Sequence, residues 1–202
     1  DGAKLTVRGG KATIEGGTIV STNQYVVNGG NDSISTGDEM SLLSLYVEEG
    51  YDTKGANFFL TDDIYLTTQG IDHGGAGFTP IGTGISIDFE ITGTKRFLGD
   101  FDGCGYTVYG LYIVSDFLDF AGLFGRCKGS TIKNLGVCGD ILGDDEVGGI
   151  CGDAKGGTFE QCSNYGNISG KDENVGGIVG SVENGKIYNC VNFAAVVGKN
   201  KV

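Results

Sequence analysis

The chain has 202 residues, of which 39 are glycine and one is proline, and its formal net charge is −12. This glycine content is far above the usual ~7%, and the interleaved aliphatic and aromatic residues favour short strands with tight turns over a flexible linker. The acidic charge argues against nucleic acid as a partner. The sequence also lacks an apolar run of the length that a membrane span needs, so no membrane insertion is predicted.

In residues 1–41 the sequence pattern predicts β segments followed by the start of a helix. Lys4–Ser21 alternates polar and apolar residues between glycine pairs, which is typical of two strands. Thr36 and Glu39 have the spacing of a capping box, and Gly50 is a natural helix stop. We therefore predict one short helix over residues 38–49, positioned to cover an open end of the fold.

A short internal repeat dominates the second half of the chain. The hexapeptide at 147–152 returns at 175–180, and a related one lies at 120–125. The unit is too short for a propeller blade and contains no crossover helix. Stacked coils of short parallel strands explain it, so we predict an all-β, right-handed parallel β-helix of about 28 residues per coil. The repeats are expected at 120–146, 147–174 and 175–202, within one continuous domain over 42–202.

Stacking places equivalent residues of successive coils in columns. The predicted apolar columns are Ile132–Phe159–Ile187, Leu135–Cys162–Cys190 and Ile141–Ile168–Val196. Asn164 and Asn192 align as an amide ladder. The parallel Cβ vectors in a column suit a disulfide poorly, so stacked cysteines are expected as reduced thiols. Residues 107–111 are interpreted as a partial earlier copy of 131–135.

The sequence resembles a known family of repeats. The motifs GLFG at 122–125, GICG at 149–152 and GIVG at 177–180 are similar to the GLUG repeat of bacterial surface proteins. Residues 59–66, 78–82 and 101–108 resemble the segment that introduces those repeats. The resemblance covers roughly residues 42–202. It implies a β-helix on an exported, adhesin-like bacterial cell-surface protein, and it transfers no catalytic residue.

Three tyrosines are the candidate ligand-binding residues. Tyr109 and Tyr112 should point outward from one strand, and Tyr188 is expected in the same column as Tyr109. Exposed aromatic rings can stack on sugar rings or anchor a protein partner.

Acidic turns provide the candidate metal site. Asp144 and Asp145 are expected to stack on Asp172 and Glu173 of the next coil. Carboxylates together suit a hard cation, so Ca²⁺ is the one cofactor considered. The cysteine spacing and the single histidine argue against a zinc site.

These features favour a non-catalytic module of an extracellular surface protein that binds a host glycan or host protein, or serves as a rigid stalk. The alternative is a carbohydrate-active β-helix enzyme, a polysaccharide lyase or hydrolase, with Asp144 and Asp145 as the candidate catalytic pair. A third hypothesis is a spacer between functional domains elsewhere. The abrupt start at Asp1, without a signal peptide, leads us to expect a piece of a larger exported chain.

Overall fold

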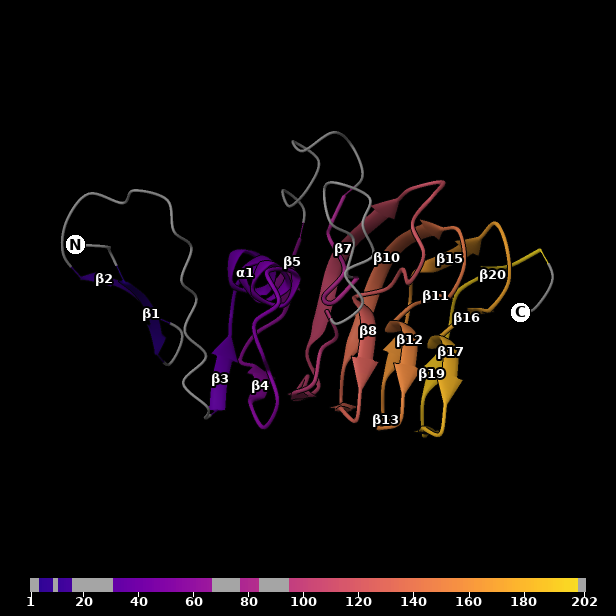
Figure 1. Cartoon of the computed structure of the whole chain (residues 1–202). Coiled ribbons are helices and arrows are strands. Elements are labelled where there is room, and N and C mark those ends of the chain that lie inside the picture. Colours follow the sequence, from indigo (N-terminus) through magenta and orange to yellow (C-terminus); the bar gives the residue numbers. More distant parts are fainter. Residues whose placement is uncertain (1–3, 9–10, 16–30, 67–76, 84–94, 200–202) are drawn as a thin grey trace.

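The computed structural model describes residues 4–8, 11–15, 31–66, 77–83 and 95–199, and parallel strands dominate it (Figure 1). One six-stranded sheet takes a strand from each successive coil, in the order β18-β13-β9-β6-β4-β3. A seven-stranded and a three-stranded sheet form further faces of the coils. The chain is therefore a parallel β-solenoid of about five turns, which confirms the predicted fold class.

The six-stranded sheet consists of β3 (Asn31–Ile34), β4 (Asn57–Leu60), β6 (Asp100–Asp102), β9 (Thr131–Lys133), β13 (Thr158–Glu160) and β18 (Lys186–Tyr188). The seven-stranded sheet consists of β5 (Ile64–Tyr65), β7 (Thr107–Val114), β10 (Gly136–Gly143), β14 (Ser163–Asn164), β15 (Asn167–Gly170), β19 (Val191–Asn192) and β20 (Val196–Val197). The three-stranded sheet consists of β8 (Phe124–Lys128), β12 (Cys151–Lys155) and β17 (Val179–Glu183). Two short pairs complete the list: β11 (Val147–Gly148) with β16 (Val175–Gly176), and the antiparallel β1 (Lys4–Arg8) with β2 (Lys11–Glu15).

The register confirms the predicted repeat length of about 28 residues per coil. Phe124 pairs with Cys151, and Cys151 pairs in turn with Val179. The predicted columns Ile132–Phe159–Ile187 and Ile141–Ile168–Val196 are also in register. The side chains of each column stack at the strand spacing and fill the inside of the coils.

Burial changes along each column. Phe159 is fully buried, whereas Ile187 in the last described coil is 43% exposed. Val182, in the same coil, is 44% exposed although its partner Ala154 is fully buried. The inward side chains of this coil therefore contact apolar neighbours on one side only.

One prediction of register is wrong. Residues 107–109 pair with 136–138 of the seven-stranded sheet and not with 131–133. The partner of Ile132 in the preceding coil is Phe101. Both segments alternate a Thr, an apolar residue and a polar or aromatic residue, so the two-residue period alone did not distinguish them.

The turns from the six-stranded sheet to the seven-stranded sheet within each coil depend on special backbone positions. Asn134, Gln161 and Asn189 follow equivalent strands of the six-stranded sheet, and all three have positive φ angles of 52° to 55°. Asparagine tolerates this left-handed conformation better than most residues. At Gly149 the constraint is close approach, because a Cβ would lie 2.6 Å from the carbonyl oxygen of Gly177. A side chain at this position of the repeat would therefore displace the backbone of the next coil.

Helix α1 (Gly37–Glu48) lies at the end of the stack opposite to the C-terminal coils (Figure 1). Thr36 is its N-cap, and its hydroxyl accepts a hydrogen bond from the backbone N–H of Glu39. Glu39 reaches back to the backbone N–H of Ser35 rather than that of Thr36. The predicted helix is thus confirmed to within one residue. It follows β3, a strand that the sequence did not assign to the solenoid.

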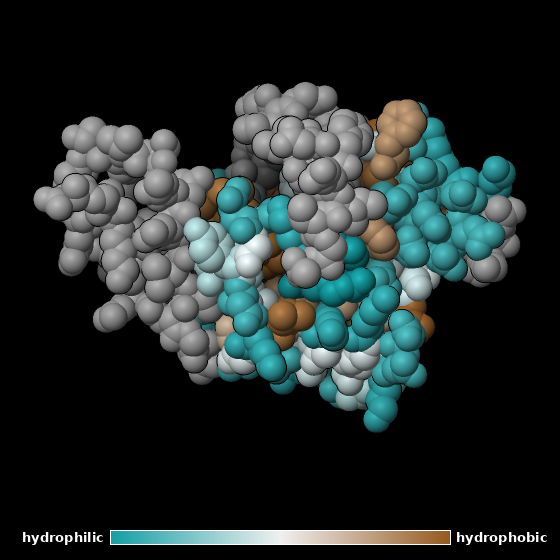
Figure 2. Space-filling view, in the orientation of Figure 1, coloured by the Kyte–Doolittle hydropathy of each residue, from teal (hydrophilic) through white to brown (hydrophobic). Residues whose placement is uncertain are grey.

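Hydrophilic residues cover most of the described surface on the side shown in Figure 2, and the hydrophobic areas there are small and separate. Among the described residues, no helix has the length and apolar character needed to cross a membrane.

Candidate functional site

A row of aromatic residues runs along the outer side of the seven-stranded sheet. Tyr65 pairs with Tyr109, and Tyr109 pairs with Cys138 of the next coil. Val137 pairs with Asn164, and Asn164 pairs with Asn192. The residues that follow these three, Cys138, Tyr165 and Phe193, are therefore also aligned. We call the four residues Tyr65, Tyr109, Tyr165 and Phe193 the aromatic row.

The rings of the aromatic row stack in two pairs. The centroids of Tyr65 and Tyr109 are 5.2 Å apart at an interplanar angle of 15°. Those of Tyr165 and Phe193 are 5.1 Å apart at 4°. Tyr65 and Phe193 are more than half exposed, at 61% and 65%. The stacked rings on neighbouring parallel strands form a continuous apolar surface in each pair.

The predicted tyrosines divide between two faces. Tyr109 belongs to the aromatic row, and Tyr112 is exposed further along the same strand. Tyr188 lies on the six-stranded sheet, paired with Glu160, so its predicted alignment with Tyr109 is wrong. The hydrogen bond from its hydroxyl to Glu160 raises the pKa of Tyr188.

A groove of about 590 Å³ opens on the outer side of the six-stranded sheet. Its lining residues are Asn57, Phe58, Phe59, Asp100, Phe101, Asp102, Cys104, Thr131 and Lys133, of which Phe58 and Phe101 have side chains buried in the core. A groove of this size suits a small ligand.

The charged groups of the groove are largely paired with one another. The Asp102 carboxylate lies 3.2 Å from Lys133 Nζ and accepts hydrogen bonds from Asn134 Nδ2 and the Cys104 N–H. Partial burial opposes ionisation of Asp102, but these hydrogen bonds and the Lys133 charge outweigh it and lower its pKa. Asp100 accepts a hydrogen bond of 2.6 Å from the Thr131 N–H. The groove therefore presents few polar groups that still need a partner.

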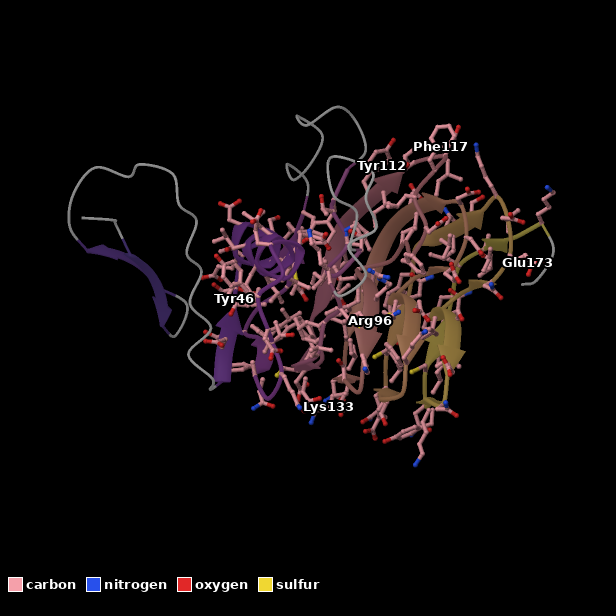
Figure 3. The ribbon with its side chains drawn as sticks, viewed as in Figure 1. Tyr46, Arg96, Tyr112, Phe117, Lys133 and Glu173 are labelled. Atoms are coloured by element: carbon pink, nitrogen blue, oxygen red, sulfur yellow. The ribbon has the colours of Figure 1, made fainter. Side chains whose placement is uncertain are left out.

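The acidic turns stack as predicted. The Asp172 N–H donates to the Asp144 carbonyl, and the Glu146 N–H donates to the Glu173 carbonyl. The Asp145 carboxylate accepts hydrogen bonds from the Glu146 N–H and Asn174 Nδ2. Across the described ranges, no three carboxylate, thiol or imidazole groups converge as a metal site. Figure 3 places Glu173 well apart from Lys133, so these turns do not border the groove.

A buried cluster of charges lies beside the three-stranded sheet. Arg96, labelled near β8 in Figure 3, forms an ion pair of 2.9 Å with Asp153, and both side chains are largely buried. Arg126, which precedes Asp153 in its column, lies 4.8 Å from the ring centroid of Phe120. Burial is the main cause that lowers the Arg126 pKa, and the neighbouring charge of Arg96 adds to it.

All six cysteines are free thiols, including the stacked Cys162 and Cys190, for which reduced thiols were expected. In the predicted column, the Cys162 N–H donates to Cys190 Sγ at 3.4 Å. A hydrogen bond from the Cys162 thiol lowers the pKa of Cys190 to about 7. The same contact raises the pKa of Cys162. Cys190 is thus the more acidic thiol of this pair.

Comparison with known proteins gives two distant relatives. The chain is 29% identical over 154 residues to a protein of Evansella cellulosilytica described as a Gly-rich membrane protein. It is 30% identical over 179 residues to halomucin of Haloquadratum walsbyi. The matches cover 76% and 83% of this chain but only 15% and 2% of the relatives' lengths. No family model and no solved structure matches the chain.

Several residues of these surfaces were not identified from the sequence. Tyr65, Tyr165 and Phe193 each follow or end a strand. Their alternation with inward residues was visible in the sequence. However, Tyr65 and Tyr109, which pair between β5 and β7, are separated in sequence by a distance that does not match the repeat length. Arg96 lies outside the repeat, so its ion pair with Asp153 had no sequence signal.

The carboxyl of Glu146 gives a prediction for the pH dependence of stability. Burial, and then the charges of Asp145 and Asp153, raise its pKa from 4.5 to about 7. The folded state therefore holds this proton more tightly than the unfolded state, and the stability that it contributes below pH 4.5 is lost as the pH rises through about 7. Glu146→Gln should match the wild type at pH 4.5 and melt about 2 to 4 °C higher at pH 8.

Glu146→Asn distinguishes the effect of the carboxylate charge from the effect of the backbone conformation at this position. Glu146 has a φ of 48°, and Asn174 holds a similar left-handed position, with a φ of 62°, in the next coil. Asparagine should add stability at both pH values, because it tolerates this conformation better than glutamate or glutamine. Thermal unfolding followed by circular dichroism measures both effects. An equal gain at pH 4.5 and pH 8 for Glu146→Gln contradicts the titration argument.

Proposed function

We propose that this chain is a rigid, non-catalytic module of an extracellular, adhesin-like protein of the bacterial cell surface, and that its aromatic row binds a neutral glycan. The row is the observation that carries the proposal. The solenoid supports it, because stacked coils hold outward side chains on a flat, regular face suited to an extended partner. The names of the two relatives, a membrane protein and a halomucin, also agree with a place at the cell surface.

The chemistry of the row favours a sugar chain over other partners. Exposed aromatic rings offer apolar surface to the C–H faces of a sugar, and the tyrosine hydroxyls add hydrogen bonds at its rim. The net charge of −12 repels sulfated and sialylated chains, so neutral glycans are the expected class. The resemblance to the GLUG repeat of bacterial surface proteins supports a location at the cell surface.

An array of neutral, sialylated and sulfated glycans, mucins and matrix proteins tests this function. The labelled chain should bind neutral glycans, and Tyr165→Ala with Phe193→Ala should weaken binding at least tenfold. Tyr188→Ala is the matched control, because this tyrosine is 42% exposed but lies on another sheet. Equal loss in the control variant, or binding to protein ligands alone, overturns the proposal.

Two further arms of the same experiment address the alternatives. Binding that requires Ca²⁺ and is lost with chelator assigns a role to the acidic turns around Asp144 and Asp172. Release of sugar products by the wild-type chain, abolished in Asp144→Asn, supports the carbohydrate-active enzyme instead. A chain that binds no ligand of any class leaves the rigid stalk or spacer as the function.

A further inference from the structure

The aromatic row has a break at its centre. Cys138 occupies the position between Tyr109 and Tyr165, and its half-buried side chain is far smaller than the rings on either side. Tyr109 stacks on Tyr65, and Tyr165 stacks on Phe193, so each pair has an inner ring that faces the position of Cys138.

The spacing of the strands fixes the width of this break. Tyr109 and Tyr165 lie two coils apart, which corresponds to about 9.6 Å between their strands at ~4.8 Å per coil. Within each pair the ring centroids are 5.1 to 5.2 Å apart. A flat six-membered ring placed above Cys138 would therefore lie about one stacking distance from each of the two tyrosines. We call this space the Cys138 slot.

Polar side chains border the slot at both ends. On one side lie Asp140 and Asn167, which are exposed and joined by a hydrogen bond of 3.0 Å from Asn167 Nδ2 to Asp140 Oδ1. A carboxylate has capacity for further donors. On the other side lie Ser163 and Thr107. The Thr107 hydroxyl leans over Gly136, where a Cβ would collide with its Oγ1. The slot thus combines apolar walls with hydrogen-bonding ends.

We propose that the Cys138 slot binds a single neutral hexopyranose residue of the glycan chain, with its two faces against Tyr109 and Tyr165. This inference rests on the proposed function and specifies its central subsite. A pyranose has C–H groups on its faces and hydroxyls at its edge, which matches aromatic walls and polar ends together. A purely aromatic ligand would form no hydrogen bonds with the polar groups at the two ends of the slot.

Filling the slot is the direct test. Cys138→Tyr places a ring between Tyr109 and Tyr165 and continues the stacked row, so the protein should keep its circular dichroism spectrum and melting temperature. Cys138→Ser leaves the slot open and is the matched control. With methyl β-D-glucopyranoside, methyl β-D-galactopyranoside and methyl α-D-mannopyranoside as probes, saturation-transfer NMR should show binding by the wild type and the serine variant. The tyrosine variant should bind at least tenfold more weakly.

A second readout locates the sugar. Iodoacetamide alkylation of Cys138, quantified by peptide mass spectrometry, should slow at least threefold when the bound methyl glycoside is present. Cys104 is exposed on the other sheet and should react at an unchanged rate.

The two readouts separate failure of the slot from failure of the proposed function. If Tyr165→Ala with Phe193→Ala loses glycan binding while Cys138→Tyr keeps it, the aromatic row binds glycans and the slot inference is wrong. Protection of Cys104 and Cys138 alike also contradicts it. If the wild-type chain binds neither the array nor the methyl glycosides, both proposals are wrong.

Discussion

Phe159→Asp is expected to unfold the central coils, whereas Ile187→Asp should leave most of the solenoid folded. Both residues occupy one column, but Phe159 is fully buried and Ile187 is 43% exposed. An unpaired carboxylate at position 159 would lie between Ile132 and Ile187, away from water, and should cost several kcal/mol. At position 187 the carboxylate can reach solvent, so the expected cost is about 1 to 2 kcal/mol.

Urea unfolding followed by far-UV circular dichroism distinguishes the two variants. The wild type and Ile187→Asp should each show a cooperative transition, with the midpoint of the variant shifted downward. Phe159→Asp should lack native signal in buffer. A folded Phe159→Asp protein means that the register of the six-stranded sheet is wrong. Unfolding of both variants to the same degree means that position 187 is covered in solution.

Asn164→Ala is expected to destabilise the chain by about 2 to 4 kcal/mol. The Asn164 side chain is fully buried and donates to the Gly166 carbonyl at 2.7 Å. Its Oδ1 also accepts from the Gly166 N–H, and Nδ2 donates to Asn192 Oδ1 at 2.7 Å. Alanine removes all three hydrogen bonds and leaves both backbone groups of Gly166 without these partners inside the fold.

Asn192→Ala is the control within the same ladder. Asn192 makes an equivalent bond to the Ala194 carbonyl, but it is exposed, so water can replace the lost partners. Its expected cost is below about 1 kcal/mol. The larger effect of Asn164→Ala is attributed to the two buried hydrogen bonds between Asn164 and Gly166, and not to the contact between Asn164 and Asn192. Equal destabilisation by the two variants in chemical unfolding contradicts this explanation.

The repeated part of the fold could be predicted from the sequence because its coils obey one rule. From Phe120 onward the coils keep a nearly constant length, so side chains such as Ile132 and Phe159 align by counting alone. The amide ladder of Asn164 and Asn192 follows from the same count. Helix α1 was predictable for a different reason, since its N-cap and its glycine stop are local signals.

The earlier coils could not be predicted in this way. In the six-stranded sheet Phe58 pairs with Phe101, and Phe101 pairs with Ile132, so the separation in sequence differs from one coil to the next. Insertions between strands change the number of residues per coil without disturbing the sheet. Each strand needs only a neighbouring strand whose inward and outward side chains alternate in the same phase. The misplacement of residues 107–109 arose from this freedom. It also concealed Tyr65, and with it the start of the aromatic row.

The structure brings together only some of the residues that the sequence selected as candidates. Tyr109 was selected as an exposed ring, and it belongs to the row, but its neighbours there come from strands whose pairing required the structure. The acidic turns stack as counted, yet stacking does not make their carboxylates converge within the described part of the chain. Whether side chains converge depends on rotamers and hydrogen bonds, which a repeat pattern does not encode.

The parallel register between coils also sets how the chain responds to tension. A pull along the solenoid axis acts across the hydrogen bonds that join one coil to the next, and each coil is held mainly by its immediate neighbours. Each coil that detaches should release about 90 Å of extended chain. Because the coils from Phe120 onward have nearly constant length, their successive detachment should extend the chain in steps of nearly equal size.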